Sequence, residues 1–233
     1  MGKAKDTGEE VASAKQRISQ FIKDVDERRL KDLVIERPTL RGIVAGFLAE
    51  EDFKDDYLRG DYLGTTDYPI YDLEEPDDHD RSKNKADQIV RIEIHGEEHE
   101  VRFQQKSVQT NPIRKTDEGL KASVQNDGSD NREVKIPGTD RKVKTTCILV
   151  GDYDVLVVPT FPFSGERTWA FKLNSKCART EHKKYRVEDR PYLLKTVEKI
   201  TWPLSDDWTD DVSVILEQLI QERAEGSIEP AAA

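Results

Sequence analysis

The sequence lacks the features that would assign it to several broad classes of protein. Its two cysteines, Cys147 and Cys177, lie far apart without a CxxC partner, so the pattern predicts neither a disulfide framework nor a zinc site. No apolar run approaches the roughly 20 residues that span a bilayer, and the opening MGKAKDTGEE has no apolar core of a signal peptide. We therefore expect a cytoplasmic protein with no membrane association.

The net charge of −10 is distributed unevenly along the chain. Residues 50–80 hold thirteen acidic and two basic residues, whereas residues 101–195 hold nineteen basic and twelve acidic residues. A phosphate backbone could meet the basic segment while the acidic segment faces elsewhere. The alternative, which charge alone favours, is that both segments are ordinary solvated surfaces.

The chain before residue 87 is expected to form two helices and a loop. Residues 8–34 repeat apolar side chains at helical spacing, and a second helix is predicted after Pro38 with Thr39 as its N-cap. The apolar face of this second helix comprises Leu40, Ile43, Val44, Phe47 and Leu48. Residues 55–86 are acidic and rich in turn formers, which predicts a loop.

A β-hairpin is expected from Asp87 to Lys106. The stretch DQIVRIEIHGEEHEVRFQQKS alternates apolar and polar residues on both sides of a short turn at Gly96. Ile92 and Ile94 are expected on one face of the first strand, with Ile89 on the opposite face.

The chain after the hairpin is expected to complete a sheet. Residues 110–140 are polar and rich in turn clusters, which predicts a long loop, whereas residues 155–158 are continuously apolar like a strand buried on both faces. Residues 168–174 alternate as a further strand, and residues 207–223 carry apolar side chains at helical spacing. The order predicts an α/β fold with a mixed central β-sheet flanked by helices.

Three side chains of the hairpin are the strongest candidates for chemistry. Asp87 opens the first strand, and Gln104 and Lys106 close the second, so the two strand ends are neighbours in space. Residues 104 and 106 share one face because they are two apart on a strand. A carboxylate and neutral oxygens suit Mg²⁺, and the backbone carbonyl of Gln105 could also reach the metal. A nearby lysine can orient an attacking water and offset charge on a phosphate.

The stretch from Asp87 to Lys106 resembles the core of the PD-(D/E)xK nucleases, in which an acid precedes a hairpin that ends in Glu/Gln-x-Lys. The later strand GDYDVLVV is similar to the one that follows the catalytic lysine in restriction-type members. The resemblance covers roughly residues 40–220. It implies a restriction-endonuclease-like fold and an Mg²⁺-dependent endonuclease, with Mn²⁺ as a substitute, that cuts double-stranded DNA as a homodimer.

The resemblance implies a domain organisation and has two departures. Residues 1–37 would be an N-terminal helical region, residues 38–223 the nuclease-like domain with a polar insertion at about 110–140, and residues 224–233 a flexible tail. The family more often has Glu at the position of Gln104, and an amide oxygen is a weaker metal ligand. Many members also carry a Glu on the preceding helix, where this chain has Gly46, so Glu50 or Glu51 is the candidate substitute.

Further residues are candidates for contact with nucleic acid. Short polar side chains follow the lysine directly, and two basic groups follow later in the chain. The candidates are Ser107, Gln109, Thr110, Asn111, Arg114, Lys115, Arg141, Lys142, Lys144, Arg179, Lys183, Lys184 and Arg186. Solvated loops are the equally weighted alternative for the basic groups.

Each functional interpretation has a structural or functional rival. The trio could be a charged hairpin edge that discourages pairing with other sheets. Asp154, inside the most apolar segment, is interpreted first as a structural acid that pairs with a base. A repair or recombination nuclease specific for DNA structure, and a catalytically silent module that binds nucleic acid or protein, both remain alternatives to a restriction-type enzyme.

Overall fold

The computed structural model describes residues 26–64, 68–76 and 86–226, with the side chains of residues 109–112 and 129–130 outside the description. The chain divides into two compact units, residues 1–48 and residues 49–233. Most of the helix predicted over residues 8–34, and most of the predicted tail over 224–233, lie outside the described residues.

Helices dominate the described part of the first unit. α2 spans Glu27–Glu36 and is capped by Asp26, whose carboxylate accepts a hydrogen bond from the backbone N–H of Arg29 at 3.0 Å. α3 spans Pro38–Phe53 and runs on into the second unit, as expected for the second helix. Of its predicted apolar face, Phe47 is exposed, and the buried residues of α3 are Ala49 and Phe53.

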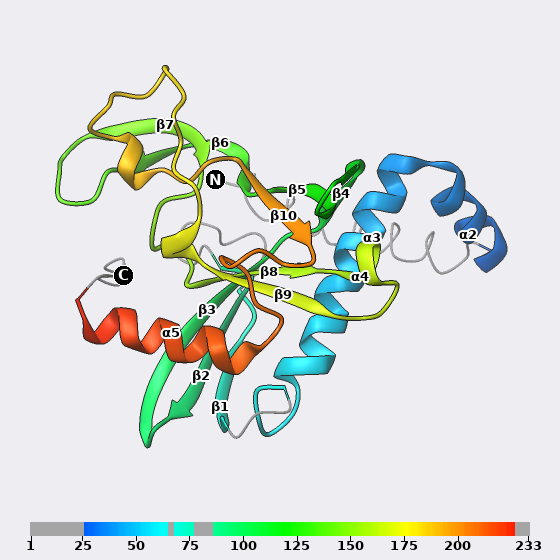
Figure 1. The fold of residues 1–233 in the computed structure, drawn as a ribbon, viewed down its shortest axis with the longest axis horizontal. Coiled ribbons are helices and arrows are strands. Elements are labelled where there is room, and N and C mark those ends of the chain that lie inside the picture. The colour runs from blue at the N-terminus through cyan, green and yellow to red at the C-terminus, as the bar shows by residue number, and fades with distance from the viewer. Residues whose placement is uncertain (1–25, 65–67, 77–85, 227–233) are drawn as a thin grey trace, which may run out of the picture. The chain divides into compact units, whose positions relative to one another are not determined.

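The second unit is built on a five-stranded mixed sheet in the order β1-β2-β3-β8-β9 (Figure 1). Its strands are β1 Ile70–Glu74, β2 Gln88–Ile94, β3 Glu97–Gln105, β8 Val155–Pro159 and β9 Trp169–Leu173. Only β3 and β8 pair in parallel, and the other neighbours are antiparallel. The predicted hairpin and the two later strands are therefore confirmed, together with a mixed central sheet that carries helices.

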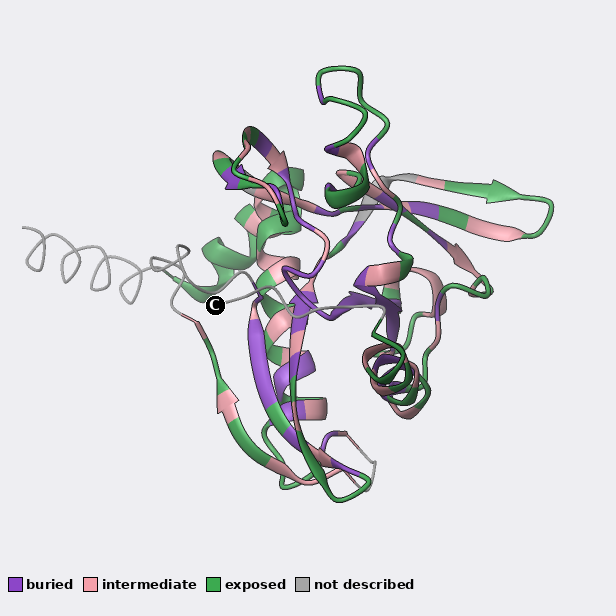
Figure 2. Cartoon of the chain, turned by 90° about the vertical axis from the view of Figure 1, so that its left-hand side faces the viewer, coloured by how far each residue is buried: buried purple, intermediate pink, exposed green. Residues whose placement is uncertain are grey.

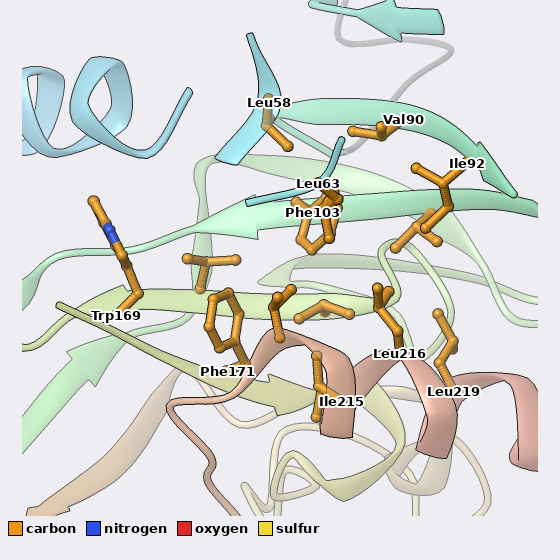
Figure 3. Packing of buried hydrophobic residues seen from close by; sticks show 14 of the residues in the cluster. Leu58, Leu63, Val90, Ile92, Phe103, Trp169, Phe171, Ile215, Leu216 and Leu219 are labelled. Carbon is orange, nitrogen blue, oxygen red and sulfur yellow. The ribbon is translucent and has the colours of Figure 1, made fainter. Parts of the chain in front are cut away.

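One face of this sheet packs against the end of α3 and against α5, which spans Val212–Ala224. Apolar residues at alternate strand positions, such as Phe103 and Phe171, meet Ile215 and Leu216 of α5 in one cluster (Figure 3). Phe53 of α3 packs against Phe103 with 5.7 Å between ring centroids. Burial of these large side chains supplies most of the free energy that holds the helices on the sheet.

The opposite face is covered by strands instead of helices. A three-stranded sheet in the order β10-β5-β4 contributes Val108, Ala122, Val124 and Ile200 to a second core with Leu156 and Val158 of β8. Its strands are β4 Val108–Thr116, β5 Gly119–Gln125 and β10 Val197–Trp202. At β8 both faces of the central sheet are apolar, because every residue of this strand is apolar and buried.

The prediction of a loop over residues 110–140 is wrong. Two antiparallel hairpins occupy this segment, β4–β5 and then β6 Asp127–Lys135 with β7 Lys142–Cys147. Polar residues alternate with single apolar ones here, for instance Val134 and Ile136, and long-range packing buries those apolar positions. The segment is polar because one face of each hairpin is exposed, and for that reason its composition resembled that of a loop.

Residues 176–195 pack against the β6–β7 hairpin. Tyr185 and Leu193 form a third apolar cluster with Val134, Ile136 and Cys147. The short elements that complete the chain are the π-helical turn η1 Lys54–Leu58, the helical turn α4 Phe161–Ser164, and the 3-10 turns η2 Asn174–Lys176 and η3 Arg190–Tyr192. η1 and β1 lie in the predicted loop over residues 55–86, which is therefore partly regular structure.

Buried residues gather in the strands and in the helix faces that meet them, whereas the tips of the hairpins are exposed (Figure 2). Within the described ranges, every helix is too short or too polar to cross a lipid bilayer.

Candidate active site

The β2–β3 hairpin brings Asp87 into contact with Gln104 and Gln105. The turn between the strands is His95–Gly96, with both residues at positive φ, which matches the right-handed twist of a two-residue hairpin. The register pairs Gln88 with Phe103, so Asp87 lies opposite Gln104. The backbone N–H of Asp87 donates to the carbonyl of Phe103 at 3.0 Å. The predicted juxtaposition across the hairpin is therefore present.

The Asp87 carboxylate is held by two donors on β3. Its Oδ2 accepts a hydrogen bond from the backbone N–H of Gln105 at 2.7 Å and another from Nε2 of Gln104. Gln104 is 4% exposed, so this contact lies inside the protein. In this orientation the amide nitrogen of Gln104 faces the carboxylate, and rotation of the amide group by half a turn would present its oxygen instead.

Lys106 lies immediately beyond β3, two residues after Gln104. Its backbone N–H donates to the carbonyl of Val157, which continues the parallel pairing with β8. Its ammonium lies 3.4 Å from the backbone carbonyl of Asp127, the first residue of β6. The structure thus joins Asp87 and Gln104 directly and places the Lys106 side chain against the start of the β6–β7 hairpin.

Glu50 on α3 lies close to this end of the hairpin. Its Oε1 accepts a hydrogen bond from Nε2 of Gln88 at 3.2 Å, and Gln88 is fully buried next to Asp87 in the chain. Glu51 instead pairs with Lys54 at 2.9 Å and with Arg59 at 2.7 Å. Of the two acids that sequence reasoning proposed on this helix, Glu50 is therefore the one joined to the hairpin.

Lys54 pairs with Glu50 and with two other acids beside it. Its ammonium lies 3.3 Å from Glu50 and 2.9 Å from both Glu51 and Glu75. Burial by itself would lower the pKa of Lys54, but hydrogen bonds to Glu51 and Glu75 outweigh that effect and raise the pKa above its ordinary value. The acidic cluster on this side of the site therefore carries a permanent internal cation. Sequence reasoning missed Lys54, although it is one of only two bases in the acidic segment.

Several buried amide atoms at the same end of the hairpin lack hydrogen-bond partners. Among the residues that the structure describes, these include Oε1 of Gln88 and both side-chain polar atoms of Gln105. A buried polar atom without a partner is unfavourable by about 1–3 kcal/mol, and such atoms often mark the place of a water or an ion. Strand alternation places the side chains of Gln88 and Gln105 on the face of the sheet that meets α3, opposite to the side chain of Gln104.

The ligand set suits a hard divalent cation in its chemistry. The Asp87 carboxylate, the Gln104 side-chain oxygen and the Gln105 carbonyl are all oxygens, the ligand type that Mg²⁺ prefers. Asp87 supplies the only negative charge among these three ligands. In the described ranges, no three His, Cys, Asp or Glu side chains gather in a way that would hold a metal ion. Asp87, Gln104 and Gln105 thus fit Mg²⁺ by ligand type, with water and substrate needed to complete the shell.

Asp154 is a buried structural acid, as the sequence suggested. Its carboxylate accepts from the backbone N–H of Arg102 at 2.8 Å and from the guanidinium of Arg102 at 3.0 and 3.1 Å. Arg223 of α5 adds a second guanidinium at 3.1 Å. Burial works against the charged form of Arg102, but the hydrogen bond to Asp154 outweighs it and raises the pKa of Arg102. The group joins the sheet to α5.

The candidate nucleic-acid residues separate into three groups. Ser107, Arg114 and Lys115 are exposed near or on β4, while the side chains of Gln109, Thr110 and Asn111 lie outside the described ones. The second group, on the β6–β7 hairpin, includes Lys142 and Lys144. It lies beside the third group, Lys183, Lys184 and Arg186, because the hairpin packs on the segment that carries them.

Two of the basic residues proposed for nucleic-acid contact have structural partners. Arg141 forms an ion pair with buried Asp189 at 2.6 Å. The guanidinium of Arg179 donates to the backbone carbonyls of Asn174, Ser175 and Cys177, and burial lowers its pKa. These two side chains hold the 176–195 segment in place. Lys142, Lys144, Lys183 and Lys184 remain exposed and suited to an external anion.

Comparison of the chain with protein-family models, with curated proteins and with solved structures finds no match.

Proposed function

We propose that this protein is an Mg²⁺-dependent endonuclease that hydrolyses phosphodiester bonds in double-stranded DNA, in the manner of a restriction-type enzyme. The observation that carries the proposal is the contact of the Asp87 carboxylate with Gln104 and Gln105, the two residues that directly precede Lys106. A half-buried carboxylate held against amide groups at the open end of a hairpin could bind a cation and, with it, a phosphate. The resemblance to the PD-(D/E)xK core supplies the reaction class.

The proposed roles follow from the chemistry of each group. Asp87, the Gln104 side-chain oxygen and the Gln105 carbonyl would hold Mg²⁺, which, when bound, polarises a phosphate and makes a water more acidic. The Lys106 ammonium offsets the negative charge that grows on the phosphate and orients the attacking water. Gln88 holds Glu50 at the same end of the hairpin, on the α3 side of the sheet, where Lys54 pairs with it. The exposed lysines on β7 would bind the DNA backbone.

The direct test is cleavage of supercoiled plasmid by the purified protein with Mg²⁺ or Mn²⁺. Asp87→Ala and Lys106→Ala should each lower the cleavage rate by about 100-fold or more, because each removes a group that acts on the reacting phosphate. Lys121→Ala, which removes an exposed lysine from β5, is the matched control and should cut at the wild-type rate. Wild-type cutting by the Asp87 or Lys106 variant, with folding retained, contradicts the assignment.

A module that binds nucleic acid or protein without cutting is the second candidate function. The observation in its favour is the low charge of the ligand set, which has one carboxylate in direct contact with Gln104. Binding of duplex DNA without cleavage in either metal supports this candidate. Branched substrates tested beside linear ones, with preferential cutting of the branched ones, would instead indicate a structure-specific repair nuclease.

A further inference from the structure

The β6–β7 hairpin is a separate two-stranded ribbon. β6 and β7 pair with each other and with no other described strand (Figure 1, green, upper left). One face of the ribbon is buried, since Val134, Ile136 and Cys147 pack against the segment 176–195. The other face of the ribbon is exposed.

Lysines dominate the exposed face. Strand alternation places Glu133 and Lys135 of β6 on it with Lys142 and Lys144 of β7. The register sets Lys135 opposite Lys142, and like charges directly opposite each other destabilise an antiparallel pair. A surface that holds two lysines in this arrangement gains stability when an anion comes between them.

The acids near these lysines hold them weakly. Lys142 pairs with Glu133 at 3.0 Å and Lys135 with Asp140 at 3.4 Å, but all four side chains are more than 60% exposed. Exposed ion pairs of this kind contribute about 0–1 kcal/mol and are screened by salt. No acid lies within ion-pair distance of Lys144 among the described residues. The three ammonium groups can therefore be transferred to phosphates at little energetic loss.

The ribbon is anchored firmly at its base and along its inner side. Lys106 contacts the carbonyl of Asp127 at the first residue of β6. Arg132 pairs with buried Asp152 at 3.1 Å, and the hydroxyls of Thr145 and Tyr185 are hydrogen-bonded. These contacts attach the base and the inner side of the ribbon to the same unit that carries the candidate active site.

We propose that the exposed face of the β6–β7 ribbon is a docking surface for double-stranded DNA, on which Lys135, Lys142 and Lys144 bind backbone phosphates away from the phosphate that is cut. Lys135, the strand partner of Lys142, lies eight positions beyond Asp127, up to about 26 Å at roughly 3.3 Å per residue. At about 3.4 Å per base pair, the contacts would fall within about eight base pairs of the cut phosphate. The position of these contacts relative to the cut rests on the proposed function. The binding of DNA by the ribbon does not depend on that function.

The test is the salt dependence of DNA binding by the full chain. Fluorescence anisotropy of a fluorescein-labelled 30-base-pair duplex of mixed sequence, measured at several KCl concentrations without divalent metal, gives the slope of log affinity against log salt. Lys142→Gln with Lys144→Gln should weaken binding and reduce the magnitude of this slope by about 2, since each phosphate contact contributes about 0.9. Lys142→Arg with Lys144→Arg keeps both charges and should keep the slope.

The matched control removes two charges elsewhere in the same unit. Lys121→Gln with Lys199→Gln changes exposed residues of β5 and β10 and should leave the slope within about 0.5 of wild type. A wild-type slope in the ribbon variant, an equal loss in the control, or no binding of duplex DNA by the wild-type protein would each overturn the proposal. Absence of plasmid cleavage with an intact slope effect would count against the proposed function alone.

Discussion

Asp87 and Asp154 lie on opposite sides of β3 and use the same strand in similar ways. The Asp87 carboxylate accepts the backbone N–H of Gln105 on the side of β2, and the Asp154 carboxylate accepts the backbone N–H of Arg102 on the side of β8. The side chains around them differ. Asp154 meets the guanidinium groups of Arg102 and Arg223, whereas Asp87 meets the neutral amide of Gln104.

The two acids thus have side-chain partners of different charge within one sheet. Two guanidinium groups compensate the charge of Asp154 and convert it into a link between β3, β8 and α5. The described donors to Asp87 are a side-chain amide and a backbone N–H, both uncharged. Both the side-chain partner and the degree of burial therefore distinguish Asp154, which is buried among guanidinium groups, from Asp87, which is half-buried beside an amide.

The largest expected effect is on stability at Asp154. Asp154→Ala should lower the free energy of unfolding by about 3–5 kcal/mol, because it leaves two buried or half-buried guanidinium groups without their carboxylate. Urea unfolding followed by circular dichroism measures this loss. Asp87→Ala should lose less, about 1–3 kcal/mol, because the two donors that it leaves behind, the Gln105 N–H and the Gln104 amide, are uncharged. Equal losses at the two positions would mean that Asp87 is also a structural acid, and the distinction would fail.

An intermediate effect is expected when Gln104 becomes a carboxylate. Gln104→Glu places a second negative charge against Asp87, which destabilises the metal-free protein but raises the affinity for a divalent cation by about tenfold, or roughly 1.4 kcal/mol. Thermal melting at several Mn²⁺ concentrations measures this affinity without any cleavage. Gln104→Leu removes the side-chain oxygen and should shift the melting temperature with Mn²⁺ less than wild type does. Identical Mn²⁺ responses in all three proteins would exclude Gln104 from the metal site.

The smallest effect is expected at Glu217, an exposed acid of α5 that contacts His95 at the turn of the same hairpin. Hydrogen bonds from His95 and then Tyr68 lower the pKa of Glu217 from its ordinary value near 4.5. A lowered pKa in the folded state means that this stabilisation is present above about pH 4.5 and is lost as the pH falls through the folded-state value. Glu217→Gln should cost less than about 0.5 kcal/mol, as for other exposed pairs.

The pH dependence of the melting temperature tests this contribution of Glu217. The melting temperatures of wild type and Glu217→Gln should differ slightly near neutral pH and converge as the pH falls below the folded-state pKa of Glu217. A difference that grows at acid pH would have the wrong sign for a carboxylate whose pKa is lowered.

Local pattern was sufficient for the elements whose periodicity is strong. The hairpin from Asp87 to Lys106, the apolar strand from Val155 and the helix that begins at Val212 were all predictable, because alternation or helical spacing is present within a few residues. The strands of residues 110–140 were not predictable, since only a few apolar positions per strand reveal them. β10 was missed for the same reason.

The residues from 87 to 106 by themselves determine that Asp87 lies beside Gln104, because a two-residue turn leaves one register for the hairpin. The tertiary structure alone decided the partners of each acid. Arg223 reaches Asp154 from a helix at the end of the chain, and Glu50 reaches Gln88 from a helix before the sheet. The Lys106 side chain likewise meets a ribbon whose packing depends on residues 176–195. Such contacts join residues far apart in the chain, and no local periodicity records which of them the folded core will bring together.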